Sequence, residues 1–414
     1  MNDNPIVLTL THMAHGGSAM GRLDGKVFFV PHALPGEKVT VEIVEDRRGF
    51  ARARLLELLT ASPERVSPPC PYFGECGGCQ WQHASYAAQL AFKADIVRDQ
   101  LTRLGGFADP PVRQAIASPE AWQYRNHVQF AIDRQGRLGF RAAASRKTVA
   151  VEACLLLHPL LDELFLALDF ENDAGERPPL RRLSLRAGIN TGDRMIVFES
   201  VDDEPPELEV DLPVSCVLLL EDGTPVNLIG HNHITERVCG RSFCVSAGSF
   251  FQVNTAQVET LLRLVAEYLA PAGDETLLDA YCGVGTFSLS LADRVAHVIG
   301  IESAPTAVED FRANAHGLEN VAIFPGTVEE VLPNLETPID LAVMDPPRSG
   351  MHPAALAALI RAKPERMVYV SCDPATLARD GRALADAGYA LQVVQPVDMF
   401  PQTYHVETVS LWKK

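Results

Sequence analysis

The sequence lacks any hydrophobic run of the roughly 18 to 20 residues that a membrane-spanning helix needs, so we expect no integral membrane protein. Its first residues, MNDNPIVLTL, lack a basic segment followed by a long apolar stretch, which argues against secretion. It also lacks low-complexity tracts and repeats of solenoid period. The 414 residues are 47% hydrophobic and 21% charged, which is typical of a cytoplasmic globular protein. The length predicts roughly two to three domains.

Positive charge is scarce, since 36 Lys and Arg residues stand against 53 Asp and Glu residues and the net charge is −17. A protein that coats nucleic acid through its overall charge is therefore excluded. The charges are unevenly distributed along the chain. Residues 202–222 hold eight acids and no Lys or Arg, whereas residues 93–147 hold ten basic residues and five acids. That local excess of positive charge still allows one face of the protein to bind a polyanion such as nucleic acid.

The nine cysteines are an odd number in a chain without an export signal, which argues against a disulfide framework. Cys70, Cys76 and Cys79 form a C-x5-C-x2-C pattern in a Pro/Gly-rich stretch, which predicts a metal site. A structural zinc site could add His83, four residues after Cys79, as its fourth ligand. A four-cysteine iron–sulfur cluster would use the distant Cys154 instead. Spacing alone leaves both alternatives open.

Turn residues and hydrophobic patterns divide the chain into different kinds of structure. Residues 1–60 alternate short β-branched strands with glycine turns, the pattern of a small barrel of the oligonucleotide-binding kind. Residues 86–105 read as an amphipathic helix, and residues 108–240 read as mixed strands and acidic loops. From about residue 255 strands alternate with helices. This alternation predicts a doubly wound α/β domain with a largely parallel sheet.

The segment LLDAYCGVGTFSL places Gly283 and Gly285 at a strand-to-helix turn, where the backbone can approach a ligand closely. Glu302 ends the next strand, where a carboxylate can accept hydrogen bonds from ribose hydroxyls. A dinucleotide is the rival ligand, but Ser288 stands where the G-x-G-x-x-G fingerprint has its third glycine. This favours S-adenosylmethionine, which has no pyrophosphate to bind. The alternative without a ligand is a plain tight turn.

Asp345 and Cys372 stand at the ends of two expected strands, at the carboxyl edge of the sheet, and Glu407 lies within an alternating strand near the end of the sequence. Each also has a structural alternative: a helix-cap neighbour for Asp345, a small core residue for Cys372 and a solvated strand residue for Glu407. Jointly they fit methylation of carbon 5 of uracil. That carbon becomes nucleophilic only after a thiolate adds to carbon 6. A base must then remove the carbon-5 proton.

At this point the sequence resembles the RNA uridine-5 methyltransferases, the bacterial 23S rRNA and tRNA (uracil-5-)-methyltransferases that carry an N-terminal TRAM domain. The resemblance extends over nearly the whole chain, and it rests on the motifs GRLDGKVFFVPHALPGE, CPYFGECGGCQWQHASY, FFQVN, DAYCGVGTFSL, MDPPRSG, SCDPATLARD and FPQTYHVETV. It implies a multidomain α/β protein: a TRAM-like, RNA-binding barrel at 1–60, an iron–sulfur central domain at 61–240 and a Rossmann-like class I methyltransferase domain at 241–414. The helix at 86–105 is then expected to pack on the catalytic domain.

The resemblance also implies roles for individual residues. The nucleophile would be Cys372 and the base Glu407. Contacts to S-adenosylmethionine would come from Gln252, Tyr281, Thr286, Glu302 and Asp345, with Glu329 near the adenine. A [4Fe–4S] cluster would be bound by Cys70, Cys76, Cys79 and Cys154.

The expected activity is methylation of a specific uridine in structured RNA by a cytoplasmic monomer. A barrel together with a cluster resembles the 23S rRNA branch more than the short tRNA enzymes, which lack both. A tRNA substrate is the first alternative, because some TRAM-containing relatives modify tRNA. A non-catalytic RNA-binding protein or chaperone that keeps the fold is the second. The joint presence of Cys372 and Glu407 argues against it.

Overall fold

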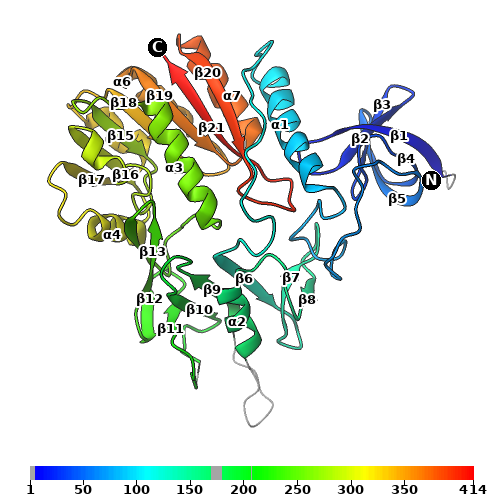
Figure 1. Ribbon diagram of the computed structural model, residues 1–414, viewed down its shortest axis with the longest axis horizontal. Helices are drawn as coiled ribbons and strands as arrows, with labels where there is room; N and C mark the ends of the chain where they lie inside the picture. The colour runs from blue at the N-terminus through cyan, green and yellow to red at the C-terminus, as the bar shows by residue number, and fades with distance from the viewer. Residues whose placement is uncertain (1–4, 169–179, 207) are drawn as a thin grey trace.

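The computed structural model describes residues 5–168, 180–206 and 208–414. It contains a small barrel near the N-terminus, a mixed sheet in the middle of the chain and a larger α/β portion that ends at the C-terminus (Figure 1). In Figure 1 the helix α1, coloured cyan, lies between the barrel and the α/β portion.

The N-terminal strands form a closed barrel in the order β1-β2-β3-β5-β4, which confirms the expectation from the sequence. Its strands are β1 (Ile6–Met13), β2 (Ala19–Leu23), β3 (Lys26–Val30), β4 (Lys38–Asp46) and β5 (Phe50–Thr60). Alternate residues point inward, so that Leu8 and Leu10 of β1 meet Val39 and Val41 of β4 in the core. Closure pairs every strand on both sides and leaves no free sheet edge.

The helix α1 (Tyr86–Arg103) begins at Ser85, whose side-chain oxygen accepts a hydrogen bond from the backbone N–H of Ala88 at 3.2 Å. It precedes the central sheet in the chain, yet it packs against α7 (Pro374–Asp386) of the α/β portion. Val97 and Leu101 on its buried face join the core cluster of that portion.

A seven-stranded sheet in the order β12-β11-β10-β9-β6-β7-β8 fills the middle of the chain. Its elements are β6 (His127–Ile132), β7 (Leu138–Arg141), β8 (Thr148–Ala150), α2 (Pro159–Ala167), β9 (Leu180–Ala187), β10 (Arg194–Ser200), β11 (Ser215–Leu219) and β12 (Pro225–Ile229). The helix α2 packs against β9, and Leu161 and Leu164 of α2 are buried in the core of this sheet. The hairpin of β13 (His233–Val238) and β14 (Arg241–Ser246) follows and packs on the α/β portion.

The C-terminal sheet has the order β17-β16-β15-β18-β19-β21-β20. Its first five strands are parallel, and β21 runs antiparallel to both β19 and β20. The strands are β15 (Thr276–Ala280), β16 (His297–Glu302), β17 (Val321–Pro325), β18 (Leu341–Met344), β19 (Arg366–Ser371), β20 (Ala390–Val397) and β21 (Glu407–Lys413). This confirms the doubly wound, largely parallel α/β fold.

Helices cover both faces of the C-terminal sheet. They are α3 (Thr255–Leu269), α4 (Pro305–Asn314), α5 (Val328–Val331), α6 (Pro353–Ala362) and α7, with short 3-10 turns at Ala292–Arg294 and Leu332–Asn334. The core cluster on one face contains residues of α3 and of the β13–β14 hairpin, and the cluster on the other contains residues of α6, α7 and α1. Every residue of β15 and β18 is buried, as expected for central strands of a parallel sheet.

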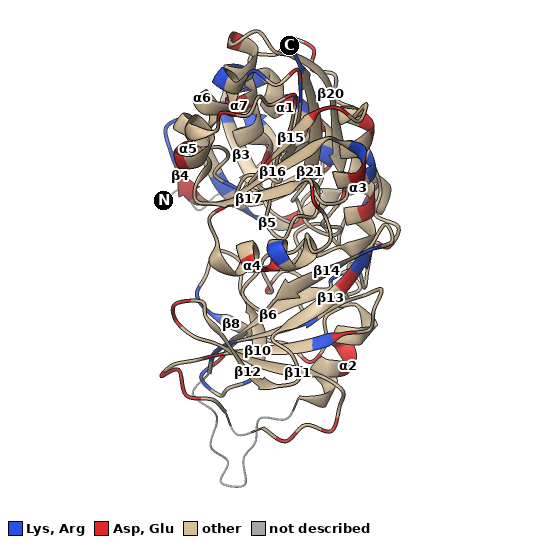
Figure 2. Cartoon of the chain, turned by 90° about the vertical axis from the view of Figure 1, so that its left-hand side faces the viewer, with Lys and Arg blue, Asp and Glu red and all other residues tan. Residues whose placement is uncertain are grey.

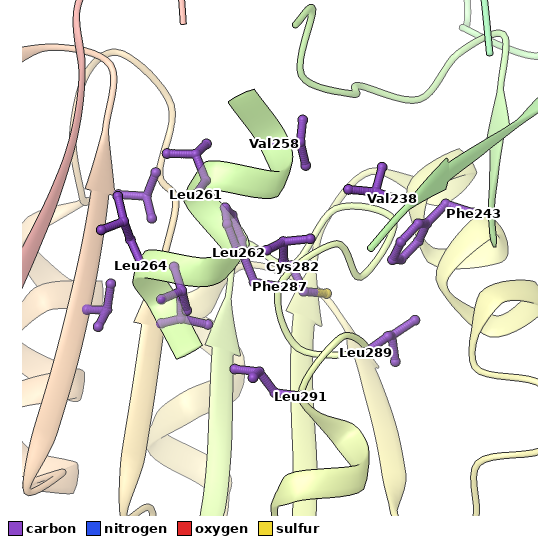
Figure 3. Packing of buried hydrophobic residues seen from close by; sticks show 14 of the residues in the cluster. Val238, Phe243, Val258, Leu261, Leu262, Leu264, Cys282, Phe287, Leu289 and Leu291 are labelled. Atoms are coloured by element: carbon purple, nitrogen blue, oxygen red, sulfur yellow. The ribbon is translucent and has the colours of Figure 1, made fainter. Parts of the chain in front are cut away.

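The sequence interpretation is wrong in one place, because the glycine turn after β15 does not continue into a helix. Residues 283–291 form consecutive turns that end in the 3-10 turn at Ala292–Arg294. Phe287, Leu289 and Leu291 are all buried in one core cluster; in Figure 3 Phe287 lies beside α3, whereas Leu289 points away from it. Their spacing of two residues does not match the 3.6-residue period of a helix, and packing of these side chains therefore determines the backbone path.

Acidic residues, red in Figure 2, lie on loops of the central sheet near β11 and β12. Within the described residues, no helix has the length and apolar character needed to cross a bilayer.

Candidate active site

Three strand ends bring Asp345, Cys372 and Glu407 to one edge of the C-terminal sheet. Asp345 follows β18 and Cys372 follows β19, its parallel neighbour. Glu407 begins β21, in which Thr408 pairs with Ser371 of β19. Cys372 and Glu407 are thus the next residues beyond that pair, on adjacent antiparallel strands. Residues far apart in the chain are therefore neighbours at this edge.

Glu407 is not a solvated strand residue, since it is only 1% exposed. The strand β21 lies between two others and is buried on both faces, unlike the alternating strand that the sequence suggests. Burial raises the pKa of Glu407 well above its usual value, the charge of Asp345 raises it further, and Arg348 acts in the opposite direction. A carboxylate in such a place is a strong base once it has lost its proton.

The same three factors, burial, Asp345 and Arg348, act on the pKa of the Cys372 thiol. Burial raises its pKa to about 12, Glu407 and Asp345 add to this effect, and the nearby Arg348 cation lowers it. Cys372 directly precedes Asp373, the N-cap of α7, whose side chain accepts hydrogen bonds from the backbone N–H groups of Ala375 and Thr376 at 2.9 and 3.0 Å. The N-terminus of a helix favours a nearby thiolate. The Asp373 carboxylate itself acts in the opposite direction and adds to the rise in the pKa of Cys372.

A cavity of about 330 Å³ opens beside this edge and is lined by Tyr281, Glu302 and Glu329 among others. Glu302 also fixes the glycine turn, since its carboxylate accepts hydrogen bonds from the backbone N–H groups of Gly283 at 2.9 Å and Ala304 at 2.7 Å. The backbone of Tyr281 has a φ of +69°, which turns the chain sharply after β15. The cavity has the size and polarity of a small-molecule site.

The other expected cofactor contacts lie outside the lining of this cavity. Gln252 donates a hydrogen bond to Asp345, with 3.2 Å between Nε2 and Oδ2, and its own carbonyl accepts one from the side chain of Asn126 at 2.9 Å. Thr286 lies in the turn beyond Gly285, where its carbonyl accepts a hydrogen bond from the Ser290 hydroxyl at 2.8 Å. The structure thus brings Gln252 and Asp345 together. Within the described residues, Thr286 neither lines the cavity nor contacts this pair through a hydrogen bond from its side chain.

The four expected metal ligands, Cys70, Cys76, Cys79 and Cys154, line one cavity of about 70 Å³. In the described part of the chain, however, no group of three or more His, Cys, Asp or Glu side chains is arranged to hold a metal ion. Burial raises the pKa of the Cys79 thiol to about 12 and also raises those of Cys76 and Cys154. Neutral thiols do not coordinate metal tightly, so a cluster here would have to displace their protons.

Comparison with known proteins agrees with these features. Residues 228–414 match the family described as tRNA (Uracil-5-)-methyltransferase, and residues 6–56 match the TRAM domain. An uncharacterised RNA methyltransferase of Halalkalibacterium halodurans is 37% identical, covering 99% of this chain and 97% of the relative. A second, from Gloeobacter violaceus, is 39% identical over 98% of this chain and 95% of the relative. The chain belongs to the tRNA (uracil-5-)-methyltransferase family.

A solved structure is also similar over its full length. The tRNA (uracil-54, C5)-methyltransferase of Pyrococcus abyssi, in complex with S-adenosyl-L-homocysteine, superposes with a TM-score of 0.78 and 29% identity. It covers 98% of this chain and 100% of its own. The protein is thus an RNA uracil-5 methyltransferase that uses S-adenosylmethionine.

Sequence reasoning missed one charged group in the interior of this methyltransferase, the side chain of Asp279. It is fully buried in β15, and burial raises its pKa to about 7. Its Oδ2 accepts a hydrogen bond from the backbone N–H of Ser288 at 3.1 Å, while its Oδ1 has no partner within the described ranges. Asp279 in turn raises the pKa of Asp345. An acidic residue within the largely apolar strand sequence TLLDA could have indicated this buried carboxyl group.

Proposed function

We propose that this methyltransferase acts on a single uridine of 23S rRNA, with Cys372 as nucleophile and Glu407 as base. The observation that carries the proposal is the place of these two residues on adjacent strand ends, next to Asp345 and the cofactor cavity. The barrel and the cysteine-bearing segment support the choice of 23S rRNA, because they resemble that branch of the family. We also propose domains at 1–60, 61–240 and 241–414; the end of the barrel strand β5 at Thr60 supports the first boundary.

The residues account for each step of the reaction. The Cys372 thiolate attacks carbon 6 of the uracil, and the electrons of the carbon 5–carbon 6 double bond move into an enolate. S-adenosylmethionine would supply a methyl group bound to a sulfonium. Carbon 5 forms the new bond to this methyl with its own electron pair, and the bond between sulfur and methyl breaks with its electrons remaining on sulfur. Glu407 then accepts the carbon-5 proton, the double bond re-forms, and the thiolate leaves from carbon 6. Arg348, which stabilises the anionic forms of both Cys372 and Glu407, favours the ionised state that this sequence needs.

Cofactor binding is assigned to the same edge. We propose that Glu302 binds the ribose hydroxyls, that Tyr281 and Glu329 border the rest of the nucleoside, and that Gln252 and Asp345 orient the reacting end. The lining of the 330 Å³ cavity supports the first three, and the hydrogen bond between Gln252 and Asp345 supports the last two. A contact from Thr286 rests on the sequence resemblance alone.

A tRNA substrate is the second candidate, and the full-length similarity to the Pyrococcus abyssi tRNA enzyme favours it. Mapping of 5-methyluridine in the rRNA and tRNA of a strain that lacks this gene distinguishes the two. We expect one site in 23S rRNA to lose its methyl group and to regain it on complementation with the wild-type gene. Loss of the modification from tRNA instead would overturn the choice of rRNA.

We further propose that Cys70, Cys76, Cys79 and Cys154 hold a [4Fe–4S] cluster. Their common cavity supports this set over one that includes His83, because His83 does not line it. The His83 ring packs near Phe73 and His32, and its Nε2 lies 3.4 Å from the carbonyl oxygen of Ala33 in the barrel.

Metal analysis of anaerobically purified protein tests this ligand set. We expect about four irons with matching sulfide per chain. Cys154→Ala should lose iron, whereas His83→Ala should retain it. Stoichiometric zinc without iron or sulfide would contradict the cluster.

A further inference from the structure

The loop between β20 and β21 leads directly to Glu407, and one of its residues is held in an unusual way. Gln402 is 3% exposed and has a φ of +68°, a left-handed conformation that a non-glycine residue adopts only when its surroundings hold it there. It precedes Glu407 by five residues.

All four polar groups of Gln402 have partners, and each partner comes from residues 80–121. Its backbone N–H donates to Gln89 Oε1 at 3.0 Å, and its side-chain oxygen accepts from Gln89 Nε2 at 3.0 Å. Its side-chain amide donates to the carbonyl of Ala121 at 3.3 Å. Its carbonyl accepts from the backbone N–H groups of Gln80 and Trp81 at 3.1 and 3.0 Å.

The two preceding carbonyls of the loop are held from the same part of the chain. The Tyr124 hydroxyl donates to the carbonyl of Pro401 at 3.2 Å, and the Lys93 ammonium donates to that of Phe400 at 3.0 Å. Gln80 and Trp81 directly follow Cys79. The residues after Cys79, the helix α1 and residues 121–124 therefore together fix three consecutive peptide groups of the loop.

Glu407 itself has little to fix its direction, since its buried Oε1 finds no hydrogen-bond partner in the part of the chain that the structure describes. Its backbone begins β21 and pairs with Val397 of β20, so the direction of its side chain depends on how the preceding loop enters the strand. We propose that Gln402 is a positioning residue for Glu407, through which the cysteine-bearing segment and α1 set the geometry of proton abstraction. This inference rests on the proposed role of Glu407 as the base.

Replacement of Gln402 tests the proposal. Gln402→Ala keeps a Cβ, and hence the same backbone restriction, but removes the side-chain contacts to Gln89 and Ala121. A misplaced base slows proton abstraction without slowing thiolate addition or methyl transfer. We expect kcat to fall by about 10- to 100-fold, KM for RNA to change by less than about twofold, and a covalent complex of protein with methylated RNA to accumulate. The complex is seen as a shifted band that survives denaturation.

Two further variants guard against a merely structural effect. Gln402→Asn is too short for the same contacts but suits the left-handed backbone better, so it serves if the alanine variant does not fold. Gln395→Ala removes another buried glutamine, whose Nε2 donates to the carbonyls of Gln114 and Pro396 at 2.6 and 3.0 Å. It should lower the melting temperature without accumulating the complex.

Glu407→Gln separates failure of this inference from failure of the proposed function. If Glu407→Gln accumulates the complex and the Gln402 variants do not, Gln402 has no positioning role and the base assignment stands. The same conclusion follows if Gln395→Ala accumulates as much of the complex as Gln402→Ala. If none of the variants accumulates it, the roles of both Glu407 and Gln402 are overturned.

Discussion

The side-chain amide of Gln252 donates a hydrogen bond to Asp345, with 3.2 Å between the two atoms. This contact joins the segment after the β13–β14 hairpin to the end of β18, at the sheet edge that also holds Cys372 and Glu407. Asn126, directly before β6 of the central sheet, donates a hydrogen bond to the Gln252 carbonyl. Gln252 therefore links the residue before β6 to the proposed methyl-transfer site.

Cys372→Ala should reduce methylation by at least about 10³-fold, because it removes the thiolate that the proposed mechanism adds to carbon 6. The fold and the affinity for S-adenosylmethionine should be largely unchanged, since the side chain is small and lies at a strand end. Calorimetric titration with S-adenosylmethionine measures the affinity, and a methyl-transfer assay measures the loss of methylation. Cys216→Ala, in the buried core of the central sheet, is the matched control and should remain active. Substantial 5-methyluridine from Cys372→Ala would remove this residue from the mechanism.

Glu407→Gln should separate methyl transfer from product release. Glutamine has nearly the size of glutamate but cannot accept the carbon-5 proton, so the bond from Cys372 to carbon 6 cannot be broken by elimination. A covalent complex with methylated RNA should therefore build up, and its formation should require both Cys372 and S-adenosylmethionine. Denaturing electrophoresis with labelled RNA detects it. Turnover near the wild-type rate would show that another group is the base.

Much of the proposed site could be predicted from the sequence, because its residues stand at the ends of strongly patterned strands. The alternation of strands and helices expected from about residue 255 is present, for example in β16, α6 and β19. The turn after Gly285 could not be predicted, because its path depends on how Phe287 and Leu289 are buried in the core that the assembled fold creates. The contacts of Gln402 could not be predicted from the sequence either, since its partner Gln89 is 313 positions away in the chain. Local patterns determine secondary structure, whereas long-range hydrogen bonds follow only from the assembled fold.

Asp279→Asn should change how stability depends on pH. Burial raises the pKa of Asp279 from 3.8 to about 7, so the folded state retains a proton that the unfolded chain has already lost. The free energy of unfolding should thus fall as pH rises from about 4 through about 7, by about 1.4 kcal/mol per pH unit for this group. Asparagine removes that contribution, while Asp345, which titrates in the same range, leaves a residual slope.

Urea unfolding of the ligand-free protein between pH 4 and pH 8 measures this effect. Asp274→Asn, at an exposed position just before β15, is the control and should leave the slope unchanged. An identical pH dependence in wild type and Asp279→Asn would mean that Asp279 is ionised in the folded protein throughout this range.

Lys93→Met should destabilise the protein more than most single substitutions. Lys93 on α1 forms an ion pair with Asp398, and both side chains are 0% exposed. Removing one partner leaves a buried charge without compensation, which costs about 3–5 kcal/mol. The double variant Lys93→Met/Asp398→Leu removes both charges and should recover most of that loss. Urea unfolding of the two variants at neutral pH makes the comparison. Equal stability of Lys93→Met and wild type would show that Asp398 is protonated when unpaired, and that the ion pair does not hold α1 against the loop before Glu407.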